Sequence, residues 1–104
     1  MPDLIDVRGR QIRLTEERAK HLETDHPEMK GQIERLHETV GAPDLIVESR
    51  TDQKAELYYR LYTATPVTTK HMCVVVKDSE TDGFVLTAYY TDTVKKGTLV
   101  WQKK

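Results

Sequence analysis

The sequence has little of what marks the specialised protein classes. It contains a single cysteine among 104 residues, so no internal disulfide can form and nothing indicates an oxidising compartment. No apolar run approaches membrane-spanning length, and the N-terminal MPDLIDVRGR carries acids where a signal peptide has an apolar run. We therefore expect a soluble, cytoplasmic protein without a membrane partner.

Neither sign of charge is in excess. Lys and Arg total 16 against 17 Asp and Glu, a formal net charge of -1, so no global positive field draws the protein to nucleic acid or membrane. With 38% hydrophobic and 32% charged residues, the composition is that of a globular protein. Residues 1–104 suit one domain with one core, in which any anion site must be local.

Common ligand motifs are also missing. The five glycines are scattered, so no glycine-rich phosphate loop is present. His21 and His26 are five residues apart and followed by Pro27, which breaks the i, i+4 geometry of two helical metal ligands. We expect neither metal nor cofactor. Cys73 lies in the apolar run MCVVV and is interpreted as a small core residue rather than a nucleophile.

The first 43 residues have helical patterning after a short β-hairpin in LIDVRGRQIRL. Thr15 is placed to cap a helix over EERAKHLETD, which must stop by His26 because Pro27 disfavours the α conformation in the residue before it. A second helix is expected from Pro27 to Val40, with Gly41 as a left-handed cap. Its apolar stripe consists of Met29, Ile33, Leu36 and Val40.

From residue 44 onward the apolar period changes to two. The runs DLIVESR, AELYYRLYT, KHMCVVVKD and GFVLTAYYT are rich in β-formers and are separated by turn-like segments. This order predicts an α+β fold, in which two N-terminal helices, after the hairpin, pack on a four-stranded antiparallel β-meander. The face of the sheet without helices is then open for chemistry.

Alternation along the strands assigns side chains to the two faces. We expect the open face to collect Tyr58, Arg60, Tyr62, Thr87, Tyr89 and Thr91. We expect the core to contain Ile33, Leu36, Leu57, Val74, Val76, Phe84 and Leu86.

Several polar residues are candidates for chemistry. A histidine exchanges protons near neutral pH, and the bend before Pro27 fixes the ring of His26, although this residue can also simply cap a helix. Arg60, between two tyrosines, can offer forked donors to a phosphate or form a cross-strand ion pair. Lys95 and Lys96 can hold a phosphate backbone or be solvated turn residues.

The segments LTEERAKHLETDHPEM, APDLIVESRTDQKAELYYR, HMCVVVKD and GFVLTAYYTDTVKKGTLVW together resemble the phage-associated nuclease domains grouped with barnase, EndoU, the colicin transfer-RNA nucleases and RelE. The resemblance runs from Ile12 to Trp101 and lies in the order of the segments. It implies helices on a four-stranded antiparallel sheet, metal-independent RNA cleavage and a phage or prophage association. RNA, with transfer RNA as one candidate, is then the partner, together with an antitoxin or immunity protein.

The resemblance also implies residue roles. The motif histidine corresponds to His26, the strand arginine to Arg60, and the hydroxyl residues to Thr87 and Tyr89, which form the expected catalytic set. Beside these carried-over roles, we ourselves expect the substrate contacts to be Tyr58, Arg50, Thr91, Lys95 and Lys96. The implied reaction is attack of a ribose 2′-hydroxyl on the adjacent phosphate to leave a cyclic phosphate. It needs proton transfer and positive charge on the phosphorane.

Two other classes of function remain open, because the acidic net charge is unusual for an RNA-binding protein. One is a non-catalytic module that binds a protein in a phage particle or in a toxin and immunity pair. The other is an enzyme that acts on a different small anion. Salt-dependent, sequence-independent affinity for RNA favours the nuclease, whereas stoichiometric capture of a protein favours the module.

Overall fold

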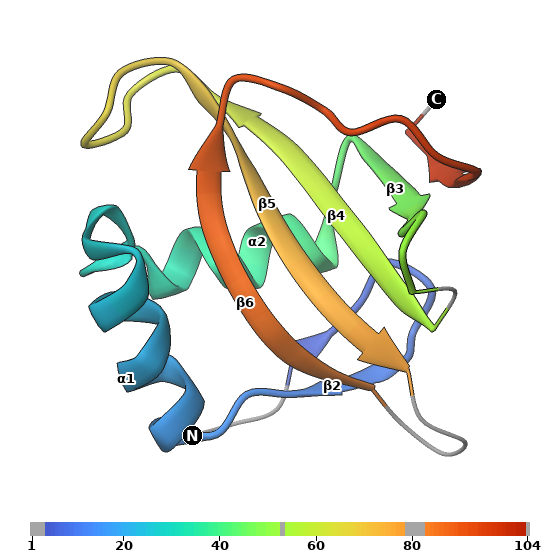
Figure 1. Ribbon diagram of the computed structural model, residues 1–104, viewed down its shortest axis with the longest axis horizontal. Coiled ribbons are helices and arrows are strands. Elements are labelled where there is room, and N and C mark those ends of the chain that lie inside the picture. Colours follow the sequence, from blue (N-terminus) through green and yellow to red (C-terminus); the bar gives the residue numbers. More distant parts are fainter. Residues whose placement is uncertain (1–3, 53, 79–82, 104) are drawn as a thin grey trace.

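The computed structural model describes residues 4–52, 54–78 and 83–103. One curled sheet carries helices on a single face (Figure 1). The helical elements are α1 (Glu16–Asp25), the 3₁₀ turn η1 (Pro27–Met29) and α2 (Ile33–Gly41). The strands are β1 (Leu4–Ile5), β2 (Gln11–Arg13), β3 (Leu45–Glu48), β4 (Ala55–Tyr62), β5 (Lys70–Asp78), β6 (Gly83–Thr91) and β7 (Leu99–Gln102).

The α+β class is confirmed, but the expected four-stranded sheet is wrong. Strands β3 to β6 are antiparallel neighbours in chain order. The sheet nevertheless has seven strands, in the order β1-β2-β6-β5-β4-β3-β7, and β2 pairs with β6 in parallel. Strands β1 and β2 form the hairpin that the sequence predicts, but their place in the main sheet beside β6 was not expected, and β7, with four residues, is too short for alternation to mark it.

The N-terminal hairpin and the first helix follow the prediction. Strands β1 and β2 pair antiparallel, and Gly9 in their turn has φ +83°, a conformation that favours glycine. The hydroxyl of Thr15 accepts a hydrogen bond from the Arg18 backbone N–H at 3.1 Å, so it caps α1 as expected. The helix ends at Asp25, one residue before His26.

The second helix begins later than predicted. Residues 27–29 form a separate 3₁₀ turn, and Gly31 follows with φ +75°, which interrupts the continuous helix expected from Pro27. At the other end, Gly41 still belongs to α2 and Ala42 is the C-cap with φ -148°. The prediction of a left-handed cap at Gly41 is therefore wrong.

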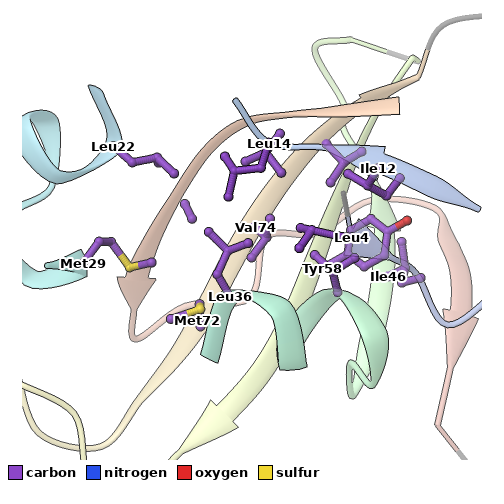
Figure 2. Packing of buried hydrophobic residues seen from close by; sticks show 14 of the residues in the cluster. Leu4, Ile12, Leu14, Leu22, Met29, Leu36, Ile46, Tyr58, Met72 and Val74 are labelled. Atoms are coloured by element: carbon purple, nitrogen blue, oxygen red, sulfur yellow. The ribbon is translucent and has the colours of Figure 1, made fainter. Parts of the chain in front are cut away.

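The main core lies between the helices and the sheet, and Figure 2 shows its side chains. Leu22 of α1, Met29 of η1 and Leu36 of α2 pack in one cluster with Met72 and Val74 of β5. Of the predicted core residues, four are buried, namely Leu36, Leu57, Val74 and Val76. Ile33 and Leu86 are half-buried.

A β-bulge in β6 changes the alternation in that strand. Val76 of β5 pairs with Val85, and Val75 pairs with Thr87. Leu86, between these two partners in β6, is therefore an extra residue. Val85 consequently faces the helices, and Phe84, predicted to be buried, is 37% exposed. Beyond the bulge the predicted alternation holds, and the open face carries Thr87, Tyr89 and Thr91.

An ionic cluster joins the hairpin to the helix-covered face of β4. The hydroxyl of Tyr58 donates to Asp6 Oδ2 at 2.7 Å and accepts from Arg8 Nη2 at 2.9 Å and Arg10 Nη2 at 2.8 Å. Arg10 Nη2 also donates to Glu56 Oε1 at 2.6 Å. Each buried polar group in this cluster therefore has a charged partner, which compensates its loss of water.

Among the described residues, no helix has both the length and the apolar character needed to cross a membrane.

Candidate anion-binding cleft

The register of the central strands arranges the open face in cross-strand rows. Because directly paired residues point to the same side, each row takes one side chain from β4, β5 and β6. The three rows are Leu57–Val75–Thr87, Tyr59–Cys73–Tyr89 and Leu61–His71–Thr91. The face therefore has a largely apolar floor in its first row, with hydroxyls along β6.

The segment between β6 and β7, residues 92–98, crosses this face and continues into β7 beside β3 (Figure 1). The backbone N–H of Lys95 donates to the Tyr59 hydroxyl at 3.1 Å. Close to β7, the Glu48 N–H donates to the Thr98 carbonyl at 2.8 Å. A Cβ atom at Gly97 would lie 2.5 Å from the Glu48 carbonyl oxygen, so only glycine allows this close approach.

A cleft of about 610 Å³, here called the sheet cleft, lies between the crossing segment and the sheet. Its volume falls in the range of small-molecule sites. None of the described residues that line it is acidic: they are Ser49, Arg50, Thr51, Leu57, Val75, Thr87, Tyr89, Lys95 and Lys96. The cleft thus combines three cations and four hydroxyls with two aliphatic side chains.

The cations of the cleft are available for a ligand. Within the described part of the chain, Arg50, Lys95 and Lys96 form no ion pair, whereas Arg10 contacts acids with its guanidinium. The backbone of Lys95 is held over the sheet by its hydrogen bond to the Tyr59 hydroxyl, and the residue lines the cleft. A local positive site therefore exists in a chain of net charge -1.

His26 reaches the wall of the cleft from the edge of β6. It sits between α1 and η1, and its ring centroid lies 5.4 Å from that of Tyr89, with the ring planes tilted by 34°. Its Nδ1 atom is 3.9 Å from Glu28 Oε2, and its side chain is 34% exposed. The predicted proximity of His26 to the hydroxyl-bearing face is thus present through Tyr89, although His26 does not itself line the cleft.

The second row of the open face holds neutral donors at neutral pH. Burial raises the pKa of Tyr59 to about 12 and raises the pKa of Tyr89 further. Burial likewise raises the pKa of Cys73, and the neighbouring hydroxyls of Tyr89 and Tyr59 offset part of this effect. Cys73 is fully buried, which agrees with its interpretation as a core residue. The chemistry available to Tyr89 is hydrogen-bond donation and ring packing rather than proton abstraction.

Arg60 lies on the opposite face, so its predicted place on the open face is wrong. Its Nη1 donates to the Ala42 carbonyl at 2.6 Å, and its Nε lies 3.5 Å from Glu38 Oε1. Tyr62 also faces α2, where its hydroxyl donates to Glu38 Oε1 at 2.8 Å. Arg60 therefore holds the C-terminal end of α2 against β4.

Tyr58 is also misplaced by the prediction, since it is fully buried in the main core. Both sets of alternating side chains in β4 are bulky, so alternation alone does not show which set faces the helices. The choice depends on the polar partners that the hairpin and α2 supply to Tyr58, Arg60 and Tyr62.

Thr91 shares the open face but does not line the cleft, and its hydroxyl accepts from the Thr93 N–H at 3.2 Å. His71, whose face the sequence does not determine, lies on the open face with its ring edge-on to Tyr59. Sequence reasoning missed four lining residues: Ser49, Thr51, Leu57 and Val75. The pairing of Leu57 with Val75 and of Val75 with Thr87 would have identified two of them, had β4 been oriented correctly.

No three His, Cys, Asp or Glu side chains of the described residues gather as metal ligands. The chain matches no protein-family model, no curated protein and no solved structure.

Proposed function

We propose that the protein is a metal-independent endoribonuclease, of a toxin-like or phage-associated kind, that cleaves RNA at the sheet cleft. The observation that carries this proposal is a cleft with three unpaired cations and no described acid, against whose wall a histidine ring packs. A cationic pocket attracts phosphate, and an adjacent imidazole can move a proton near neutral pH.

The lining of the cleft favours a single strand of RNA. Phosphate oxygens would meet Arg50, Lys95 and Lys96, while the aliphatic floor of Leu57 and Val75 would take an unstacked base. A base in a duplex cannot reach such a floor without leaving its pair, so loops and ends are the expected targets. Transfer RNA, with its exposed loops, remains a candidate substrate.

In the proposed reaction a ribose 2′-hydroxyl attacks the adjacent phosphorus, the bond to the 5′-oxygen breaks, and a cyclic phosphate remains. At the Tyr89 side of the cleft, His26 accepts the proton of the attacking 2′-hydroxyl, the departing 5′-oxygen takes a proton from water, and Glu28 lies beside the ring that becomes positively charged. The charge that the resemblance assigns to Arg60 comes instead from Arg50, Lys95 and Lys96, and the Thr87 hydroxyl donates to a phosphate oxygen.

The test is incubation of the purified protein with total RNA and with transfer RNA in EDTA, followed by mapping of the product ends. We expect cyclic phosphate and 5′-hydroxyl ends, and a loss of roughly 10² to 10⁴ in rate for His26→Ala. His21→Ala is the matched control, because His21 is exposed on α1, the helix that ends just before His26. Undiminished cleavage by the His26→Ala protein would contradict the mechanism. Stoichiometric capture of a protein without any RNA cleavage would favour the binding module instead.

A further inference from the structure

A second cavity adjoins the sheet cleft where the crossing segment meets the end of β3. This outer cavity has a volume of about 430 Å³ and is lined by Glu48, Ser49, Arg50, Lys96, Gly97 and Thr98. Three of these residues, Ser49, Arg50 and Lys96, also line the sheet cleft. The two cavities therefore share a wall that carries two cations.

The two cavities differ in what they can hold. The sheet cleft has the aliphatic floor of Leu57 and Val75, whereas none of the described residues that line the outer cavity has an apolar side chain. One acid, Glu48, lines the outer cavity beside the two cations Arg50 and Lys96, so the charge of its described lining is still positive and suits a phosphate group better than a nucleobase. Arg50 and Lys96 form no ion pair within the described part of the chain, so their charge is available on both sides of the shared wall.

The shared wall is held in place by its neighbours. The Ser49 hydroxyl accepts hydrogen bonds from the Thr51 and Asp52 backbone N–H groups, both at 3.3 Å, which fixes the turn that carries Arg50. On the other side, the close contact of Gly97 with β3 and the bond from Glu48 N–H to Thr98 fix the backbone next to Lys96. Both cations thus project from ordered backbone.

We propose that the outer cavity binds a second phosphate of the same RNA strand, so that the shortest tightly bound ligand spans two phosphates, one in each cavity. This inference rests on the proposed function for the identity of the ligand. Adjacent cavities with a common cationic wall match the repeating charge of a nucleic-acid backbone, which a ligand with one phosphate does not provide.

The test measures binding without cleavage, using single-stranded 2′-O-methyl oligouridylates that carry one, two or three phosphates. The methyl group removes the attacking hydroxyl, so the affinity does not depend on catalysis. We expect the dissociation constant to fall about tenfold from one to two phosphates, as one charge-assisted contact implies, and to change little from two to three.

Variants assign that step to the outer cavity. Thr98→Glu, which adds an acid to the outer cavity alone, should remove the gain from the second phosphate while preserving the affinity for one. Thr98→Lys should enlarge the increase in affinity that the second phosphate gives. Thr93→Glu is the matched control, because Thr93 is exposed on the same segment and lines neither cavity.

The outcomes separate this inference from the proposed function. The outer subsite would be overturned, even if the protein cleaves RNA, by either of two results. The second phosphate could increase the affinity equally in Thr98→Glu and Thr93→Glu, or it could fail to increase the affinity of the wild type. The second phosphate could instead increase the affinity of the wild type but not of Thr98→Glu, while the protein leaves RNA intact. That result would support the subsite and reject the nuclease.

Discussion

The imidazole of His26 packs on the phenol ring of Tyr89, with 5.4 Å between the ring centroids. This contact joins the turn between α1 and η1 to the open face of β6, two parts of the chain that are far apart in sequence. It makes the position of His26 depend on Tyr89.

We predict that Tyr89→Ala lowers kcat/KM for a fluorescent RNA oligonucleotide by about 10², because a displaced proton-transfer group loses its alignment with the reacting atoms. Tyr89→Phe should stay close to the wild type, since the ring that supports His26 remains. Equal losses in the two variants would assign the effect to the hydroxyl rather than to ring packing.

The charge of the crossing segment leads to a second prediction. Lys96→Ala should weaken binding to single-stranded RNA of any sequence and reduce the slope of log K against log salt by about 1, because one phosphate contact is lost. Lys20→Ala is the control, since Lys20 is exposed on α1 and lines no part of the cleft. The two slopes, measured by fluorescence anisotropy over a salt series, would coincide if Lys96 does not contact phosphate.

Arg60 has a structural role in this fold. We predict that Arg60→Ala lowers the free energy of unfolding in urea by about 1–3 kcal/mol, because the Ala42 carbonyl and Glu38 lose a charged partner. The rate of RNA cleavage per folded molecule should not change. A large loss of rate with unchanged stability would return Arg60 to the catalytic set.

The hairpin cluster predicts how stability depends on pH. Burial alone would raise the pKa of Asp6, but hydrogen bonds from Tyr58 and Arg10 outweigh it and lower this pKa below its ordinary value of 3.8. The ionised carboxyl therefore stabilises the fold above pH 3.8, and this contribution is lost as the pH falls through the lowered pKa.

Urea unfolding of Asp6→Asn beside the wild type checks this sign. The variant should be less stable at neutral pH, and the difference should narrow as the pH falls below 3.8. A difference that stays constant, or widens, in acid would show that the Asp6 charge does not contribute to stability.

Features fixed by local patterns could be predicted from the sequence. The change of apolar period near residue 43 separates helices from strands, Thr15 caps α1, and the hydroxyls beyond the bulge face the open side. Each depends on neighbouring residues along the chain, where side-chain periodicity and capping chemistry operate.

Features fixed by distant partners could not be predicted. The orientation of β4 depends on the acids and arginines that meet Tyr58 and Arg60 from other elements. The bulge at Leu86 leaves no mark in an otherwise regular strand, and β7 is recognised only by its pairing with β3. Arg60 was therefore assigned to the wrong side of the sheet, while Ser49 and Thr51 were not identified at all.

The segment that carries Lys95 and Lys96 is anchored at both ends in hydrogen-bonded strands, β6 and β7. The conformational entropy of these two lysine backbones is therefore lost when the protein folds, and little of it remains to oppose ligand binding. By thermodynamic linkage, a ligand in the cleft must in turn stabilise the pairing of β7 with β3 against local opening. Amide hydrogen exchange in β7 thus reports occupancy of a cleft that β7 itself does not line.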